Sequence, residues 1–264
     1  MKTVICHFYN EEYMLPWWLK HHKHIFDHGI MIDYNSEDRS RDVIREICPT
    51  WDIHMSQNWH FDSTTCDEEV MKWERTIEGW RMALNVTEFL YGNTDHLPDD
   101  SGFAQHFVGN YVFVDMQNRL QTNELPVLVS DRPLHDQRSW GYDEFQNKGI
   151  SRAGNMARMN RSIHNYPVDY TPGRHFGDGR PRSFNDLVIF YYGWADASKP
   201  GIARKMQIQE KMSENDKNLN AGNHIGTNED YITRFETQKR FARDLRSEII
   251  PILDHNIRCT GQHW

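Results

Sequence analysis

Residues 8–38 read FYNEEYMLPWWLKHHKHIFDHGIMIDYNSED, and this stretch decides the fold. An apolar run ends at Phe8, and a second apolar run covers residues 30–32. Short apolar runs of this kind are typical of buried strands, while the stretch between them has apolar residues three and four apart and predicts a helix. Ligands of open α/β sheets bind outside the carboxyl ends of parallel strands. We therefore expect residues 10–12 and 33–36 to line one crevice.

The sequence that follows continues to alternate between helices and strands. Residues 40–48 predict a short helix and residues 51–55 a strand. Thr65 and Glu68 form a capping-box pattern for the next helix. One face of that helix carries the apolar residues Val70, Trp73, Ile77 and Trp80. With a further strand at residues 81–84, this order predicts an α/β fold with a mostly parallel sheet and helices on both of its faces.

The second half of the chain has weaker patterns. Residues 92–102 predict a polar surface loop, and residues 111–114 and 125–129 are candidate strands. Residues 165–186 contain many glycines and prolines and predict a long irregular segment before a strand at residues 187–192. The last predicted elements are two helices, over residues 203–212 and 229–253.

The length of 264 residues suits one large α/β core, so we expect a single domain over residues 1–264. It divides into an N-terminal half (1–92), a second half (93–200) and a helical tail (201–264). There is no run of about 18 apolar residues and no signal-peptide pattern before the first strand. We therefore expect a soluble, cytoplasmic protein without a transmembrane segment.

The formal net charge of −8 opposes nucleic-acid binding, which depends on clustered lysines and arginines. A local basic zone nevertheless covers residues 148–182. This zone could receive a diphosphate or an anionic acceptor, or it could be an ordinary solvated surface.

Three motifs together resemble the glycosyltransferase family 2 type of enzyme. They are Asn10-Glu11, the helix with Leu15-Pro16-Trp17 and His21-His22, and the loop Asp33-Tyr34-Asn35-Ser36-Glu37-Asp38. The resemblance implies a GT-A type, Rossmann-like fold in which residues 1–92 bind a nucleotide sugar and residues 93–200 face the acceptor. It also implies a hexosyl- or pentosyltransferase reaction from a nucleotide-sugar donor, with a UDP-linked donor favoured. The acceptor would be a hydroxyl of a glycan or another molecule, and the anomeric carbon would be inverted.

The polar residues at the two strand ends are the expected donor site. An aspartate such as Asp33 can accept hydrogen bonds from uracil or ribose, and Phe8 or Tyr9 offers a stacking face. A competing interpretation is that Asn10 and Glu11 only cap the following helix. The expected donor-binding residues are Phe8, Tyr9, Asn10, Glu11, Asp33, Tyr34, Ser36, Asn85, Thr87 and Arg152.

The stretch Asn85-Val86-Thr87-Glu88-Phe89 departs from the resemblance, which implies Asp-x-Asp-Glu-Phe with two metal-binding aspartates. Neutral groups replace both carboxylates, although Mg²⁺ and Mn²⁺ favour carboxylate oxygen. We favour a metal-independent enzyme in which arginine or lysine side chains balance the charge of the diphosphate. The alternatives are a weak Mn²⁺ or Mg²⁺ site at Glu88 and His175, or a relative without catalysis. Glu88 could also simply anchor the loop beside it.

An inverting transfer needs a general base near the acceptor hydroxyl. The stretch Trp140-Gly141-Tyr142-Asp143-Glu144 resembles an acceptor loop of glycosyltransferases, which makes Asp143 the favoured base. Asp178 in a glycine-rich stretch is the second candidate, and Glu88 is a further candidate catalytic residue. The alternatives from other classes are an inactive nucleotide- or carbohydrate-binding relative and, more remotely, a sugar transferase acting on a modified nucleic-acid base.

Overall fold

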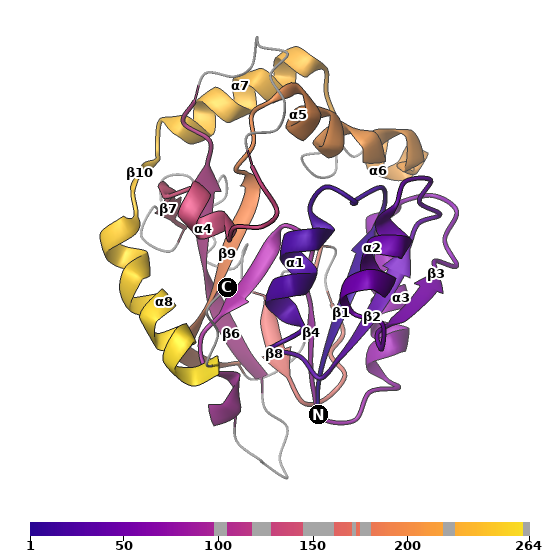
Figure 1. Ribbon diagram of the computed structural model, residues 1–264. Helices are drawn as coiled ribbons and strands as arrows, with labels where there is room; N and C mark the ends of the chain where they lie inside the picture. Colours follow the sequence, from indigo (N-terminus) through magenta and orange to yellow (C-terminus); the bar gives the residue numbers. More distant parts are fainter. Residues whose placement is uncertain are drawn as a thin grey trace.

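The computed structural model shows a mixed α/β fold built on one large sheet (Figure 1). The described residues are 1–97, 105–117, 128–144, 161–170, 173–174, 181–218 and 225–260. The strands are β1 Lys2–Phe8, β2 His28–Asp33, β3 Asp52–Met55, β4 Trp80–Ala83, β5 Glu88–Tyr91, β6 Gln105–Val114, β7 Trp140–Asp143, β8 Ser162–His164, β9 Pro181–Trp194 and β10 Arg243–Asp244. The helices are α1 Leu15–His22, α2 Ser40–Ile47, α3 Ser63–Glu74, α4 Leu134–Gln137, α5 Lys199–Met206, α6 Glu214–Asn218, α7 Asn228–Lys239 and α8 Arg246–Thr260, with the short 3₁₀ helices η1 Thr94–His96 and η3 Gln207–Lys211.

The N-terminal half contains four adjacent parallel strands in the order β4-β1-β2-β3. Side chains of a strand point alternately to its two faces, and β1 uses both. Val4 and Cys6 join the apolar core that also contains residues of α1 and α2, whereas Ile5 packs with Val70 of α3 in a separate core. The predicted alternation of strands and helices with both faces covered is confirmed for this half, and the loops after β1 and β2 lie at the same edge.

The rest of the sheet contains antiparallel pairs, so the expectation of a mostly parallel sheet is wrong. β8 runs antiparallel to β4 and β6, and β7 runs antiparallel to β6 and β10. β9 is parallel to β6 and antiparallel to β5. Parallel neighbours need a long crossover, usually a helix. Within the described residues the only helix between β4 and β6 is the short η1, so the repeat of strand and crossover helix ends at β4.

α1 completes the outer edge of β5 with its side chains. Trp18 Nε1 donates a hydrogen bond to the carbonyl oxygen of Glu88 at 3.0 Å. The N–H of Leu90 donates to His22 Nε2 at 3.2 Å, and His21 Nε2 donates to the carbonyl oxygen of Leu90 at 2.6 Å. Burial lowers the pKa of His21 to about 4 and holds the pKa of His22 well below its usual value, so both rings are neutral. Two imidazoles and an indole thus take the place of a neighbouring strand.

The third helix differs from its prediction at both ends. Asp62 is the N-cap, because its carboxylate accepts hydrogen bonds from the N–H groups of Thr64 at 3.1 Å and Thr65 at 3.2 Å. The capping box predicted from Thr65 is therefore wrong. The helix ends at Glu74, and Trp80 lies in β4 rather than on the helical face.

Several predictions in the second half are also modified. The helix predicted over 203–212 corresponds to α5 followed by η3, and the helix predicted over 229–253 is two helices, α7 and α8, with β10 between them. The strand predicted over 187–192 is confirmed, but β9 already begins at Pro181, inside the segment predicted to be irregular. Parts of the predicted loop 92–102 and strand 125–129 lie outside the described residues. No helix in the described ranges is long and apolar enough to span a membrane.

Candidate active site

The loops after β1 and β2 are tied together by hydrogen bonds. The N–H of Asn10 donates to Ser36 Oγ at 2.9 Å, and the N–H of Glu37 donates to Asn10 Oδ1 at 2.8 Å. The N–H of Glu11 donates to Ser40 Oγ, at the start of α2, at 2.7 Å. Asn10 has a φ of 50°, a left-handed conformation that asparagine adopts more readily than most residues. The structure brings the predicted residues together but uses their polar groups to join the two loops.

The two carboxylates expected to hold the donor are buried and paired. Asp33 accepts a hydrogen bond from the N–H of Ser36 at 2.8 Å, and its other oxygen lies 3.1 Å from Arg41 Nε. Glu11 Oε2 lies 2.7 Å from Arg204 Nε, on α5. Burial raises the pKa of Glu11, and Arg204 opposes that rise. Both acids therefore have a structural task in the protein as it stands.

The aromatic residues near these loops differ in their exposure. Phe8 and Tyr34 are buried, and the Tyr34 hydroxyl is hydrogen bonded to Cys66 Sγ. Tyr9 is partly exposed, and the ammonium nitrogen of Lys211 lies 4.6 Å from the centroid of its ring. Of the two rings expected to stack on a base, only Tyr9 has an accessible face.

Glu88 begins β5 in a buried pair with Arg161, which immediately precedes β8. Arg161 Nε lies 2.9 Å from Oε2 and 3.1 Å from Oε1, and Arg161 Nη2 donates to Oε1 at 2.9 Å. The N–H of Asn85 adds a hydrogen bond to Oε2 at 2.8 Å. Burial would raise the pKa of Glu88, but Arg161 and these hydrogen bonds outweigh it and lower that pKa. A carboxylate held in this way is a weak proton acceptor, and the geometry favours the interpretation of Glu88 as an anchor.

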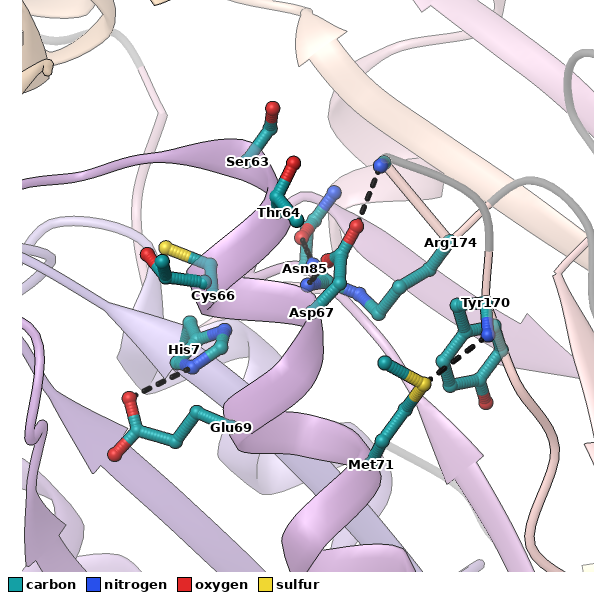
Figure 2. Close-up of polar contacts among 12 residues, drawn as sticks. His7, Ser63, Thr64, Cys66, Asp67, Glu69, Met71, Asn85, Tyr170 and Arg174 are labelled. Atoms are coloured by element: carbon teal, nitrogen blue, oxygen red, sulfur yellow. Dashed lines mark hydrogen bonds and ion pairs between the residues drawn. The ribbon is translucent and has the colours of Figure 1, made fainter. Parts of the chain in front are cut away.

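A second buried ion pair lies beside the first and joins Arg174 to Asp67 of α3 (Figure 2). Arg174 also donates from Nη2 to Asn85 Oδ1 at 3.0 Å, and the N–H of Gly173 donates to Asp67 Oδ2 at 2.6 Å. Arg161 Nη1 donates to the carbonyl oxygen of Gly173 at 2.7 Å, which links the two pairs. Both arginines come from the basic zone, and the structure buries them instead of leaving them on a solvated surface.

The arginines place positive charge where the resemblance implies a divalent cation. The amide oxygen of Asn85 accepts from Arg174, and both carboxylate oxygens of Glu88 accept from Arg161. Among the described residues, no three His, Cys, Asp or Glu side chains gather as a possible metal site. Mg²⁺ and Mn²⁺ need oxygen ligands without competing cations. The donor set at Asn85 and Glu88 therefore does not suit either ion.

Of the other residues predicted to bind the donor or a metal or to act in catalysis, some lie within the described residues and some do not. Thr87 is buried, and its carbonyl oxygen accepts from the N–H of Tyr192 at 2.8 Å, so it belongs to the turn between β4 and β5. The positions of the remaining three, Arg152, His175 and Asp178, lie outside the described residues.

Glu144, immediately after β7, combines a hydrogen bond to Asn110 with a raised pKa. Asn110 Nδ2 donates to Glu144 Oε2 at 2.6 Å, and the N–H of Glu144 donates to the carbonyl oxygen of Asn110 at 3.1 Å. Burial, followed by the charges of Asp143 and Glu88, raises the pKa of Glu144 to about 7 against the effect of the Asn110 hydrogen bond. A general base works best when its pKa is near the working pH. The sequence favoured the neighbouring Asp143, which is buried in β7.

Comparisons by sequence and by structure give different results for this chain. No protein-family model matches the chain, and no curated protein matches its sequence. Among solved structures, the crystal structure of S. aureus TarS 1-349 is similar with 9% identity and a TM-score of 0.41, covering 80% of this chain and 64% of that one. A second crystal structure of S. aureus TarS has 9% identity and a TM-score of 0.38, covering 78% of this chain and 38% of that one. The chain thus spans less than two thirds of either structure, and the fold description rests on the topology given above.

Proposed function

We propose that the protein is a metal-independent, inverting glycosyltransferase that moves a sugar from a nucleotide-sugar donor, with UDP as the favoured carrier, to an acceptor hydroxyl. The observation that carries the proposal is the convergence of Arg161 and Arg174 on Asn85 and Glu88, at the carboxyl end of β4. A parallel sheet binds its ligands at this edge. Positive side chains there can balance the charge that develops on a departing diphosphate.

Arg174 has a spare donor for such a group. Its Nε is buried and has no hydrogen-bond partner among the described residues, while its two terminal nitrogens bind Asp67 and Asn85. A buried donor without a partner costs free energy, and an anionic oxygen within reach would remove that cost. In this proposal Asp67 and Glu88 keep the two guanidinium groups in place, and Arg174 supplies the contact to the diphosphate.

Glu144 is the proposed general base of this transferase. It would take the proton from the acceptor hydroxyl as that oxygen attacks the anomeric carbon, and the donor diphosphate would leave from the opposite face of the sugar. A single displacement of this kind inverts the anomeric carbon and needs no covalent intermediate with the protein.

A second candidate function is a nucleotide- or carbohydrate-binding protein without turnover. The pairing of the expected donor-site acids favours it, because Asp33, Glu11 and Glu88 each already have a cationic partner within the protein. This candidate shares the proposed donor site with the transferase and differs from it only in the absence of chemistry.

The test combines binding and turnover. Thermal-shift measurements with nucleotides and nucleotide sugars, each with and without Mn²⁺, identify ligands that bind the folded state, because such ligands raise its melting temperature. Release of nucleotide diphosphate from the donor that binds then reports hydrolysis or transfer, with Arg174→Lys and Glu144→Gln as variants. Binding and turnover in EDTA support the metal-independent transferase. Binding without turnover supports the binding protein, and no response to any nucleotide or nucleotide sugar rejects the transferase and the nucleotide-binding protein.

A further inference from the structure

The segment of residues 199–218 lies across the loops at the carboxyl ends of β1 and β2. It contains α5, η3 and α6, which run along the top of the molecule in Figure 1. Arg204 on α5 pairs with Glu11, and Gln207 Nε2 donates to the carbonyl oxygens of Tyr9 at 2.9 Å and Asn10 at 2.8 Å. The first part of the segment is therefore bound directly to the loop on which the expected donor residues lie.

Lys211 brings the segment onto Tyr9, the partly exposed ring of that loop. Its ammonium nitrogen lies 4.6 Å from the centroid of Tyr9 and 3.4 Å from the carbonyl oxygen of Tyr34. An ammonium group over an aromatic face is a favourable cation–π contact. A nucleotide base that stacked on the same face of Tyr9 would have to displace Lys211.

The far end of the segment is fixed to the start of α3. Asp216 is buried, and it accepts hydrogen bonds from the N–H of Ser63 at 2.7 Å and from Ser63 Oγ at 3.0 Å. Ser213 Oγ donates to Asp62 Oδ2 at 2.8 Å. The N–H of Phe61 donates to the carbonyl oxygen of Lys211 at 2.6 Å. This backbone hydrogen bond joins the residues just before α3 to the residue that lies over Tyr9.

We propose that residues 199–218 form an autoinhibitory latch over the donor site, held at one end by Asp216 and closed on Tyr9 by Lys211. This inference rests on the proposed function, because it assumes that a nucleotide base binds at Tyr9. The donor then binds only when the latch has opened. When the binding-competent state is a minor fraction of the molecules, the apparent Kd is the intrinsic Kd divided by that fraction. A variant that opens the latch therefore tightens nucleotide binding.

The experiment measures the affinity of UDP for the full chain by calorimetry, without metal. Asp216→Asn weakens the charged anchor to Ser63, and Lys211→Met removes the cation from the Tyr9 ring. Loss of one hydrogen bond to a charged group corresponds to about tenfold or more in the equilibrium between closed and open states. We expect both variants to bind UDP about tenfold more tightly. The matched control is Glu214→Gln, since Glu214 lies on the same helix but is exposed and pairs with Lys217, and its UDP affinity should equal that of the unmodified protein.

Hydrogen exchange provides the second measurement. The amides of residues 207–212 should exchange faster in Asp216→Asn than in the unmodified protein, and UDP should speed their exchange in the unmodified protein as it displaces the latch. Equal affinities in all four proteins, or weaker binding by Lys211→Met and Asp216→Asn, overturn the latch and leave the proposed donor site in place. The absence of UDP binding even to the opened variants overturns the latch and the UDP donor site together.

Discussion

Glu88→Gln should destabilise the whole protein, because it removes one side of a buried ion pair. Glu88 and Arg161 form a bidentate pair in which both side chains are almost completely buried, with three N–H···O contacts of 2.9–3.1 Å. Glutamine keeps the shape but removes the negative charge, so Arg161 would remain as an uncompensated cation in the interior. Breaking a buried pair from one side costs about 3–5 kcal/mol. Total stabilities of proteins are about 5–15 kcal/mol, so this is a large loss.

Urea denaturation followed by circular dichroism measures this loss. The matched control is Glu46→Gln, whose partner Arg39 lies at a similar 2.9 Å but on the surface, and it should cost less than about 1 kcal/mol. In the double variant Glu88→Gln with Arg161→Met, the loss should be smaller than the sum of the single losses, because no buried charge is left unpaired. A loss below about 1 kcal/mol for Glu88→Gln would refute the reasoning, since it would show that water already screens the pair.

Three further predictions concern pH and packing. The free energy of unfolding should fall by about 1.4 kcal/mol per pH unit for each of His21 and His22 as the pH falls from about 6.5 towards 4, because only the unfolded chain takes up their protons. Urea denaturation at several pH values measures this slope. A stability that does not change with pH would contradict neutral buried rings. If Glu144 is the base, the transfer rate should rise with pH through about 7. Glu144→Gln should lose this inflection and be about 10²–10⁴-fold slower. An unchanged pH profile would reject the assignment. Gly29→Ala should lower the free energy of unfolding by about 1–3 kcal/mol, measured by thermal or urea unfolding, because an added Cβ would lie 2.1 Å from Trp51 Cε3. Unchanged stability would mean that the Trp51 ring moves aside without strain.

The N-terminal half could be predicted from sequence because its signals are local. The apolar run with Val4, Ile5 and Phe8 and the periodic apolar residues of α1 are short-range patterns that fix where strands and helices form. The second half lacks such patterns. Strands β6 to β9 find their partners far along the chain, and no local periodicity distinguishes a parallel neighbour from an antiparallel one.

The candidate site could be predicted only in part for the same reason. Asn10 and Ser36 were expected to lie together, because each follows a strand of the same parallel pair. The partners of Glu88 and Asp67 could not be predicted, since Arg161 lies 73 positions from the first and Arg174 lies 107 positions from the second. The one available signal was the basic zone that contains both arginines, and composition alone does not distinguish a buried guanidinium from a solvated one.

The contact between α1 and β5 bears on self-association of the protein. A strand with an unpaired edge offers its N–H and C=O groups to strands of other molecules, and proteins usually protect such edges. Here the protection consists of Trp18, His21 and His22, which bind the outward backbone groups of Glu88 and Leu90. A protonated His22 could no longer accept the hydrogen bond of Leu90, so the molecules that take up this proton also expose the edge of β5. The same imidazoles that complete the sheet at neutral pH thus make intermolecular strand pairing a hazard of acidic storage.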